Sequence, residues 1–168
     1  MKTLLLSAAA VVAALGAAFA LAPRNDIRTE VTIAAPPAEV WSVLTDGAAY
    51  RDWNPFIVDM KGKTAVGERL ENTMQPEGGS SMTFRPTVLV ADEGREFRWL
   101  GRLFLPRLFD GEHYFLLEET AEGTRLIHGE TFRGVLLWAI DTDRFRADFE
   151  RMNAALKARV EDANLAAK

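Results

Sequence analysis

The residues best suited to chemistry in this chain are its two histidines, His113 and His128, together with Glu130. On both sides of Glu122-Gly123 the sequence alternates between apolar and polar residues, which predicts two β-strands joined by a two-residue turn. With this turn, the cross-strand pairs are Leu117 with His128, Phe115 with Glu130, and His113 with Phe132. The two imidazoles and the carboxyl group then share the inward face of one hairpin.

Three kinds of chemistry fit these side chains. They can act as a general acid/base pair, bind a metal ion, or form a buried hydrogen-bonded cluster that orients the polar end of a ligand. No spacing typical of a metal site accompanies them, so we expect no metal and no cofactor. We expect the cluster and assign no catalytic residue. If the protein is an enzyme, its catalytic candidates are His113, His128 and Glu130.

The elements that position these residues begin with a strand over residues 27–33, where apolar and polar residues alternate. Pro36-Pro37 ends this strand and begins a helix, because proline is tolerated in a first helical turn. A second short helix runs to Trp53 and ends at Asn54-Pro55. A strand, two short helices and further strands predict an antiparallel α+β domain.

Further strand patterns follow, and a long helix ends the chain. With the first strand they make seven predicted strands, the others being residues 56–61, 68–74, 82–91, 96–105, 113–119 and 124–133. The last helix carries one apolar stripe, because its large apolar residues recur every three or four positions. These are Phe145, Phe149, Met152, Leu156 and Val160.

Residues 27–56, IRTEVTIAAPPAEVWSVLTDGAAYRDWNPF, resemble the START-like, helix-grip superfamily, also called SRPBCC or the polyketide cyclase/dehydrase and lipid transport type. The similarity continues at Gly111-Glu112-His113, at residues 130–134 and in the last helix, and covers residues 27–163. It implies a helix-grip fold, in which a curved seven-stranded antiparallel sheet wraps around the C-terminal helix. It also implies an internal cavity that holds an apolar ligand, on a scaffold that hosts binders, transporters and enzymes.

Strand parity indicates which side chains face that cavity. The apolar residues occupy the odd positions of residues 96–105 and the even positions of residues 82–91. We therefore expect a ligand cavity lined by Trp53, Phe84, Val88, Phe97, Trp99, His113, Phe115, His128, Glu130, Phe149 and Met152. The alternative for the apolar members of this set is that they fill the core.

The N-terminus has the pattern of a targeting segment. Lys2 precedes an uncharged run from Leu4 to Ala22, and Ala18-Phe19-Ala20 has the small-x-small form of a signal-peptidase site. The run is also long enough to span a bilayer, so a cleaved signal and a retained anchor are both open. We expect residues 1–24 to be this segment and residues 25–168 to be the ligand-binding domain. The domain is then exported to the periplasm or the exterior, free or tethered to a membrane through residues 4–22.

Composition excludes several classes of site. The net charge of −4 and the absence of a basic cluster disfavour nucleic-acid binding. The chain has no cysteine, so disulfides and thiolate zinc sites are impossible. No phosphate-binding loop, nucleotide fingerprint or nucleophile elbow is present. The oligomeric state stays open.

Residues 101–111, GRLFLPRLFDG, are unusually apolar for a connection between strands, and Pro106 interrupts any ladder there. They form a flap over the cavity mouth, a patch that touches a membrane or a partner, or a segment packed on the domain edge.

The sequence therefore predicts a protein that binds a small hydrophobic or amphipathic molecule, with transport of that molecule as an open further role. One alternative is a cyclase, dehydratase or hydrolase that acts on such a molecule. Another is a membrane-tethered accessory or stress protein.

Overall fold

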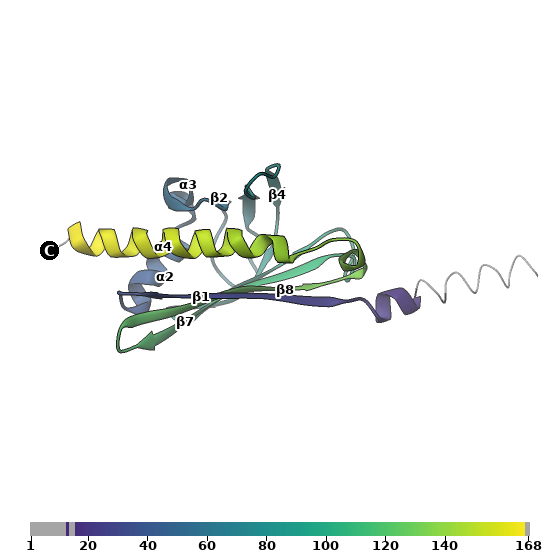
Figure 1. Cartoon of the computed structure of the whole chain (residues 1–168), viewed down its shortest axis with the longest axis horizontal. Coiled ribbons are helices and arrows are strands. Elements are labelled where there is room, and N and C mark those ends of the chain that lie inside the picture. The colour runs from purple at the N-terminus through teal and green to yellow at the C-terminus, as the bar shows by residue number, and fades with distance from the viewer. Residues whose placement is uncertain (1–12, 14–15, 167–168) are drawn as a thin grey trace, which may run out of the picture.

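The computed structural model describes residue 13 and residues 16–166 (Figure 1). Its elements are β1 (Arg24–Ile33), α2 (Pro37–Thr45), η1 (Gly47–Ala49), α3 (Tyr50–Trp53), β2 (Ile57–Lys61), β3 (Glu71–Met74), β4 (Met82–Phe84), β5 (Thr87–Asp92), β6 (Glu96–Arg102), β7 (Asp110–Thr120), β8 (Gly123–Arg133), η2 (Val135–Trp138), η3 (Asp143–Phe145) and α4 (Arg146–Ala166). Much of the predicted targeting segment, residues 1–12 and 14–15, lies outside the described residues. Within the described part of the chain, no helix is long and apolar enough to cross a membrane.

Two antiparallel sheets form the fold. The larger sheet has five strands in the order β1-β8-β7-β6-β5, and the smaller has three in the order β2-β3-β4. The long helix α4 runs along the large sheet close to β1, as Figure 1 shows. The predicted α+β helix-grip architecture is confirmed, with the two short helices α2 and α3 after the first strand.

The predicted strand over residues 82–91 is divided into two strands that belong to different sheets. Pro86 lies between β4 and β5 and has no N–H group with which to continue a ladder. As a result β4 pairs with β3, whereas β5 pairs with β6. The fold therefore has eight strands in sheets of five and three, and the prediction of one seven-stranded sheet was wrong on this point.

A β-bulge in β5 also changes the predicted parity. Val88 lies opposite Trp99, but the register shifts before Val90, which lies opposite Arg98. Ala91 then lies opposite Phe97. Because an extra residue in a strand reverses the side-chain alternation beyond it, Ala91 takes the inward position that parity had predicted for Val90.

The predicted strand over residues 96–105 ends earlier, at Arg102. Leu103 and Leu105, which parity placed on the inward face, are 42% and 60% exposed. Residues 103–109 leave the ladder and form a loop before β7 begins at Asp110.

The β7–β8 hairpin keeps the predicted parity, but its register is shifted by two residues. The turn is Ala121-Glu122, and Thr120 pairs with Gly123. Gly123 has a φ of 123°, and a Cβ atom on it would lie 2.2 Å from the carbonyl oxygen of Ile33. This glycine is required by the close approach of β1 and is not part of the turn.

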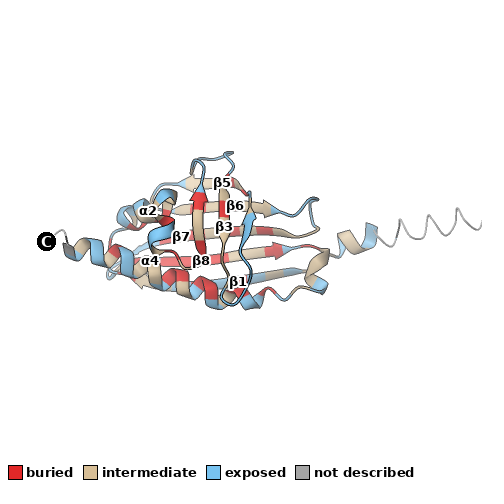
Figure 2. Ribbon diagram, turned by 90° about the horizontal axis from the view of Figure 1, so that it is seen from above, coloured by how far each residue is buried: buried red, intermediate tan, exposed pale blue. Residues whose placement is uncertain are grey.

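The core lies between the large sheet and α4. Buried residues (red in Figure 2) occur in the strands and in α4. The predicted helix stripe is confirmed, because each of its members is buried: Phe145, Phe149, Met152, Leu156 and Val160. This packing holds α4 against the same sheet face that carries the two histidines.

Candidate functional site

The hairpin register brings the two histidines and Glu130 together. His113 lies directly opposite Glu130, and Phe115 lies opposite His128. His113 Nδ1 is 3.1 Å from Glu130 Oε2, and His113 Nε2 is 2.8 Å from His128 Nε2. The predicted inward polar cluster is therefore present in this geometry, with His113 between its two partners.

Two further residues extend this cluster into a chain of hydrogen bonds. His128 Nδ1 is 2.8 Å from Asn153 Oδ1 on α4, and Asn153 Nδ2 donates to Thr29 Oγ1 at 2.8 Å. The hydroxyl of Thr29 donates to the carbonyl oxygen of His128 at 3.0 Å. We call the series Glu130–His113–His128–Asn153–Thr29 the polar chain.

Thr29 and Asn153 were not among the predicted site residues. Thr29 occupies an inward position of β1 next to Ile27, and Asn153 follows Phe149 by four residues within the apolar stripe of α4. A polar residue at a core position was the signal available in each case. Both contact His128, which is 99 residues from Thr29 and 25 residues from Asn153 in the sequence. The contacts themselves could therefore not be predicted from local patterns.

With both imidazoles neutral, the hydrogen bonds assign the ring nitrogens that carry protons. Because the amide nitrogen of Asn153 donates to Thr29, its Oδ1 accepts from His128 Nδ1. A neutral His128 then accepts at Nε2, so His113 donates from its own Nε2. A neutral His113 in turn accepts at Nδ1, and the only remaining donor is the protonated carboxyl group of Glu130.

Burial favours this neutral arrangement. Loss of hydration raises the pKa of Glu130 to about 8 and lowers the pKa of His113 to about 3. Burial and, next, the neighbouring His113 lower the pKa of His128 well below its usual 6.5. At pH 7 the contact between Glu130 and His113 is therefore a hydrogen bond between neutral groups, although an ion pair has the same geometry.

Aromatic rings enclose the polar chain. Trp99 stacks on His113 with ring centroids 4.6 Å apart, and Phe149 stacks on His128 at 4.3 Å. Phe115 also stacks on His128 at 4.5 Å, and Phe97 contacts Trp99 edge-on at 5.1 Å. These predicted cavity residues are buried and pack against one another.

The remaining predicted cavity residues lie around this centre. Val88 and Met152 are buried in the core. Trp53 is half-buried and contacts Tyr50 edge-on, and Phe84 is half-buried on β4. In the described structure these side chains fill the interior, so their contact with a ligand stays a prediction.

Glu130 occupies space that a glycine leaves open. A Cβ atom on Gly111 would lie 2.1 Å from Glu130 Oε1, so a larger residue at this position requires the carboxyl group to move. Gly111 is the cross-strand neighbour of Gly101, and the ring of Phe84 packs over Gly101. The Glu130 side chain is 16% exposed, and its Oε1 has no hydrogen-bond partner among the described residues.

Asn72 on β3 is the most unusual polar residue of the interior. It is 0% exposed, and within the described structure neither its Nδ2 nor its Oδ1 has a hydrogen-bond partner. It lies directly opposite Phe84, so the two side chains share one face of the small sheet. Sequence reasoning missed Asn72, whose only signal was an asparagine within a predicted strand.

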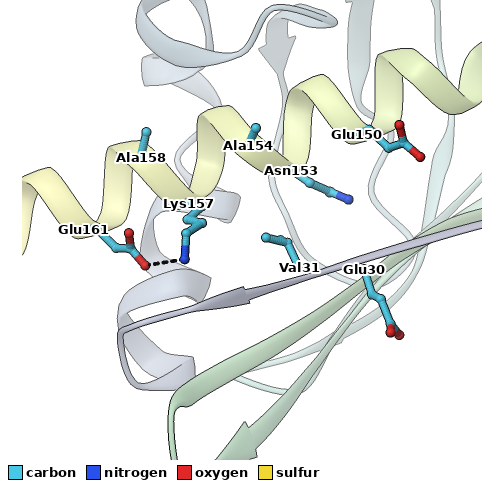
Figure 3. Close-up of a pocket in the computed structure, with 8 residues that line it drawn as sticks. All are labelled: Glu30, Val31, Glu150, Asn153, Ala154, Lys157, Ala158 and Glu161. Atoms are coloured by element: carbon cyan, nitrogen blue, oxygen red, sulfur yellow. Dashed lines mark hydrogen bonds and ion pairs between the residues drawn. The ribbon is translucent and has the colours of Figure 1, made fainter.

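Two surface pockets border α4. The first, of about 360 Å³, lies between α4 and β1 (Figure 3) and is lined by Glu30, Val31, Glu150, Asn153, Ala154, Lys157, Ala158 and Glu161. The second, of about 320 Å³, is lined by residues 76–80, Met82, Arg144, Phe145 and Asp148. Neither pocket is lined by a residue predicted for the cavity, but Asn153 links the first pocket to the polar chain.

The polar chain is poorly arranged for a metal ion. His113 uses one ring nitrogen toward Glu130 and the other toward His128, so the lone pairs do not converge on one point. Among the described residues, no group of three or more histidines and carboxylates could hold a metal. The expectation of a metal-free site stays a prediction.

Comparisons with known proteins agree with this architecture. The profile of the family described as polyketide cyclase / dehydrase and lipid transport matches residues 24–161. No curated protein matches the chain.

Several solved structures are similar in fold. A protein from Nitrosomonas europaea has a TM-score of 0.65 and 16% identity, over 84% of this chain and 96% of its own. Norcoclaurine synthase from Thalictrum flavum has a TM-score of 0.63 and 13% identity, over 85% of this chain and 98% of its own. The di-domain ARO/CYC protein StfQ of the steffimycin biosynthetic pathway has a TM-score of 0.63 and 13% identity, over 85% of this chain and 52% of its own.

Proposed function

Because the chain belongs to the polyketide cyclase/dehydrase and lipid transport family, we propose that it binds a small, largely apolar molecule between its two sheets. The apolar part of this molecule contacts the aromatic side chains around the polar chain. Its polar group forms hydrogen bonds with Asn72 and with the free oxygen of Glu130. No catalytic step is needed for this function.

The buried amide of Asn72 carries the proposal. Leaving a buried donor or acceptor without a partner costs about 1–3 kcal/mol, so such groups are rare in folded proteins. One amide offers a donor and an acceptor side by side, which suits a hydroxyl, carbonyl or carboxyl group. An apolar interior with a few such polar groups is typical of ligand sites.

The strand registers support this place for the polar group. Asn72 shares a face with Phe84, whose ring covers Gly101, and Gly101 pairs with Gly111 beneath Glu130. The two glycines contribute no side chains, and Phe84, Glu130 and Phe132 occupy the space over them. A ligand enters it by displacing the ring of Phe84, which is only half-buried.

A thermal-shift panel with the variant Asn72→Leu tests this function. We expect palmitate, cholesterol, farnesol or an anthraquinone to raise the unfolding midpoint of the wild-type protein. Asn72→Leu should raise the midpoint of the free protein, because it removes the unpaired amide at similar volume, and should reduce the ligand-induced shift.

The matched control is Thr73→Val, the next residue of β3, whose hydroxyl contacts Thr83 on the outer face. It should leave the ligand-induced shift unchanged. No shift with any ligand, or an equal shift in wild type and Asn72→Leu, would contradict the proposal and favour an accessory protein without a ligand.

A second candidate function, an acid-catalysed cyclisation or dehydration of the bound molecule, is favoured by one observation. Glu130 is protonated at pH 7 because of its raised pKa of about 8, as a general acid must be. Substrate turnover that is lost in Glu130→Gln, with ligand binding retained, would support the enzyme. Unchanged turnover in Glu130→Gln would contradict it.

We also propose that the domain works outside the cytoplasm. The basis is the uncharged run from Leu4 to Ala22 after Lys2. A reporter that is active only after export, fused behind Asn25, should be active. The mass of the mature protein then distinguishes a cleaved signal from a retained anchor.

A further inference from the structure

One end of the molecule exposes large apolar side chains. Leu103, Phe104 and Leu105 in the β6–β7 loop are 42%, 87% and 60% exposed, and Trp138 at the end of η2 is 60% exposed. We call these four residues the apolar end-face. Exposed aromatic and aliphatic groups that gather in this way usually mark an interaction surface.

Hydrogen bonds hold the loop in a defined shape. Leu103 N donates to the carbonyl oxygen of Phe109 at 3.0 Å, and Arg107 N donates to Asp110 Oδ2 at 3.1 Å. Phe104 and Arg107 adopt positive φ angles of 57° and 63°, which are unfavourable for residues other than glycine. The backbone therefore tolerates strain while it directs Phe104 into solvent.

The two segments of the apolar end-face are joined to each other. Val135 N donates to the carbonyl oxygen of Arg107 at 3.0 Å, and Leu136 N donates to that of Leu108 at 3.1 Å. These bonds connect the β6–β7 loop to η2, which ends in Trp138.

The N-terminal run ends beside the same surface. Gly134 N donates to the carbonyl oxygen of Pro23 at 3.2 Å, one residue after the uncharged run from Leu4 to Ala22. Figures 1 and 2 both show residues 16–24 at the end of the domain that carries the β6–β7 loop. A membrane that holds this run would lie next to the apolar end-face.

The charges of this end suit a surface of phosphate groups. The last cross-strand row of the large sheet here consists of Arg102, Asp110, Arg133 and Arg24. Asp110 lies near Arg102, and Asp26 pairs with Arg24. Arg133 lies close enough to Asp26 to help lower the pKa of that carboxyl, but neither Arg133 nor Arg107 forms a direct side-chain ion pair among the described residues. Arg24, Arg102, Arg107 and Arg133 outnumber Asp26 and Asp110, so positive charge is left over.

We propose that the apolar end-face lies against an anionic lipid bilayer, with Phe104, Leu105 and Trp138 in the headgroup region and Arg107 and Arg133 near lipid phosphates. Tryptophan and aliphatic side chains flanked by arginine are the combination that binds membrane interfaces. This inference does not depend on the ligand site between the sheets.

Site-specific fluorescence on the full-length protein tests the inference. The chain has no cysteine, so Phe104→Cys carries a single environment-sensitive dye, and Glu122→Cys in the β7–β8 turn is the matched control at the other end of β7. The protein is reconstituted in phosphatidylcholine vesicles that contain phosphatidylglycerol and brominated lipid. We expect a blue-shifted, several-fold more strongly quenched emission at position 104 than at position 122.

Two results would overturn the inference. One is equal, weak quenching at both positions while the N-terminal run resists extraction from the vesicles. The other is a blue shift at position 104 that depends on protein concentration without lipid, because the partner would then be a second copy of the chain. Phe104 is largely exposed, so its replacement should leave the unfolding midpoint unchanged.

Discussion

The position of a single proton determines the chemistry of Glu130. In the described geometry this proton lies between Glu130 Oε2 and His113 Nδ1, which are 3.1 Å apart. Its transfer to His113 would convert two neutral groups into an ion pair without changing the total charge of the polar chain. The low polarity of the interior keeps the proton on Glu130, so the free oxygen of this residue belongs to an acid and not to a carboxylate.

Glu130→Gln and Glu130→Leu should differ in stability at neutral pH. The glutamine amide donates to His113 Nδ1 as the protonated acid does, so we expect a change below about 1 kcal/mol. Leucine leaves His113 Nδ1 without a donor, so we expect a loss of about 1–3 kcal/mol. Urea unfolding at pH 7 measures both. A large loss in Glu130→Gln would show that Glu130 is ionised in the folded protein.

The polar chain should give stability a maximum near pH 6.5. Glu130 titrates near 4.5 when unfolded and at about 8 when folded, so its contribution is lost as the pH rises through this range. His113 titrates near 6.5 when unfolded and at about 3 when folded, and the pKa of His128 is lowered likewise. Below pH 6.5 the two histidines bind protons in the unfolded chain but not in the folded protein, so their contribution to stability rises with pH. Two histidines outweigh the opposite contribution of the single Glu130, so stability rises with pH up to about 6.5.

The decline above pH 6.5 is specific to Glu130. We expect the free energy of unfolding to fall by about 1–2 kcal/mol toward pH 8 in the wild-type protein. In Glu130→Gln this part of the decline should be absent. Urea titrations at both pH values compare the two proteins, and an identical decline in both would assign the effect to other groups.

At the scale of elements, the paired glycines of β6 and β7 make room for the site. Gly111→Ala would place a Cβ atom 2.1 Å from Glu130 Oε1, so the carboxyl group must move away from His113. We expect a loss of about 1–3 kcal/mol and disappearance of the pH effect assigned to Glu130.

Gly101→Ala is the matched control for Gly111→Ala. Its Cβ atom would meet the ring of Phe84 at 3.6 Å, an ordinary contact distance. It should therefore keep the pH dependence of the wild-type protein. Equal effects of the two substitutions on urea unfolding would contradict the placement of Glu130 over Gly111.

The elements were largely predictable, because periodicity is a local property. The alternation around His113 and His128 placed both on the inward face, and the stripe from Phe145 to Val160 is buried as predicted. The hairpin register was not readable, because Gly123 serves the contact with Ile33 and not the turn. The bulge before Val90 was missed for a similar reason, since strand pairing decides it. The division at Pro86 did have a local signal, the proline itself, which the apolar alternation of residues 82–91 outweighed in the prediction.

The candidate site was only half predictable. Parity identified His113, His128 and Glu130, whose chemistry is visible in their residue types. The role of Asn153 comes from its hydrogen bond to His128, and the role of Asn72 comes from the lack of any partner for its buried amide. Both are properties of the tertiary structure that no local sequence pattern encodes.

At the scale of the whole molecule, we propose separate roles for the interior and for the apolar end-face. We propose that the interior between the sheets binds an apolar molecule and that the apolar end-face next to the N-terminal run contacts a membrane. A variant at Phe104 should weaken membrane contact and leave the thermal shift by ligands unchanged. Asn72→Leu should do the reverse, so the two proposals can fail independently.

Native mass spectrometry of the protein purified from its own host tests the claim that the chain binds an apolar molecule. We predict a bound molecule of defined mass on the wild-type protein, extractable into organic solvent and reduced in occupancy in Asn72→Leu. A bare polypeptide mass in both proteins, together with no thermal shift from any ligand class, would contradict the claim.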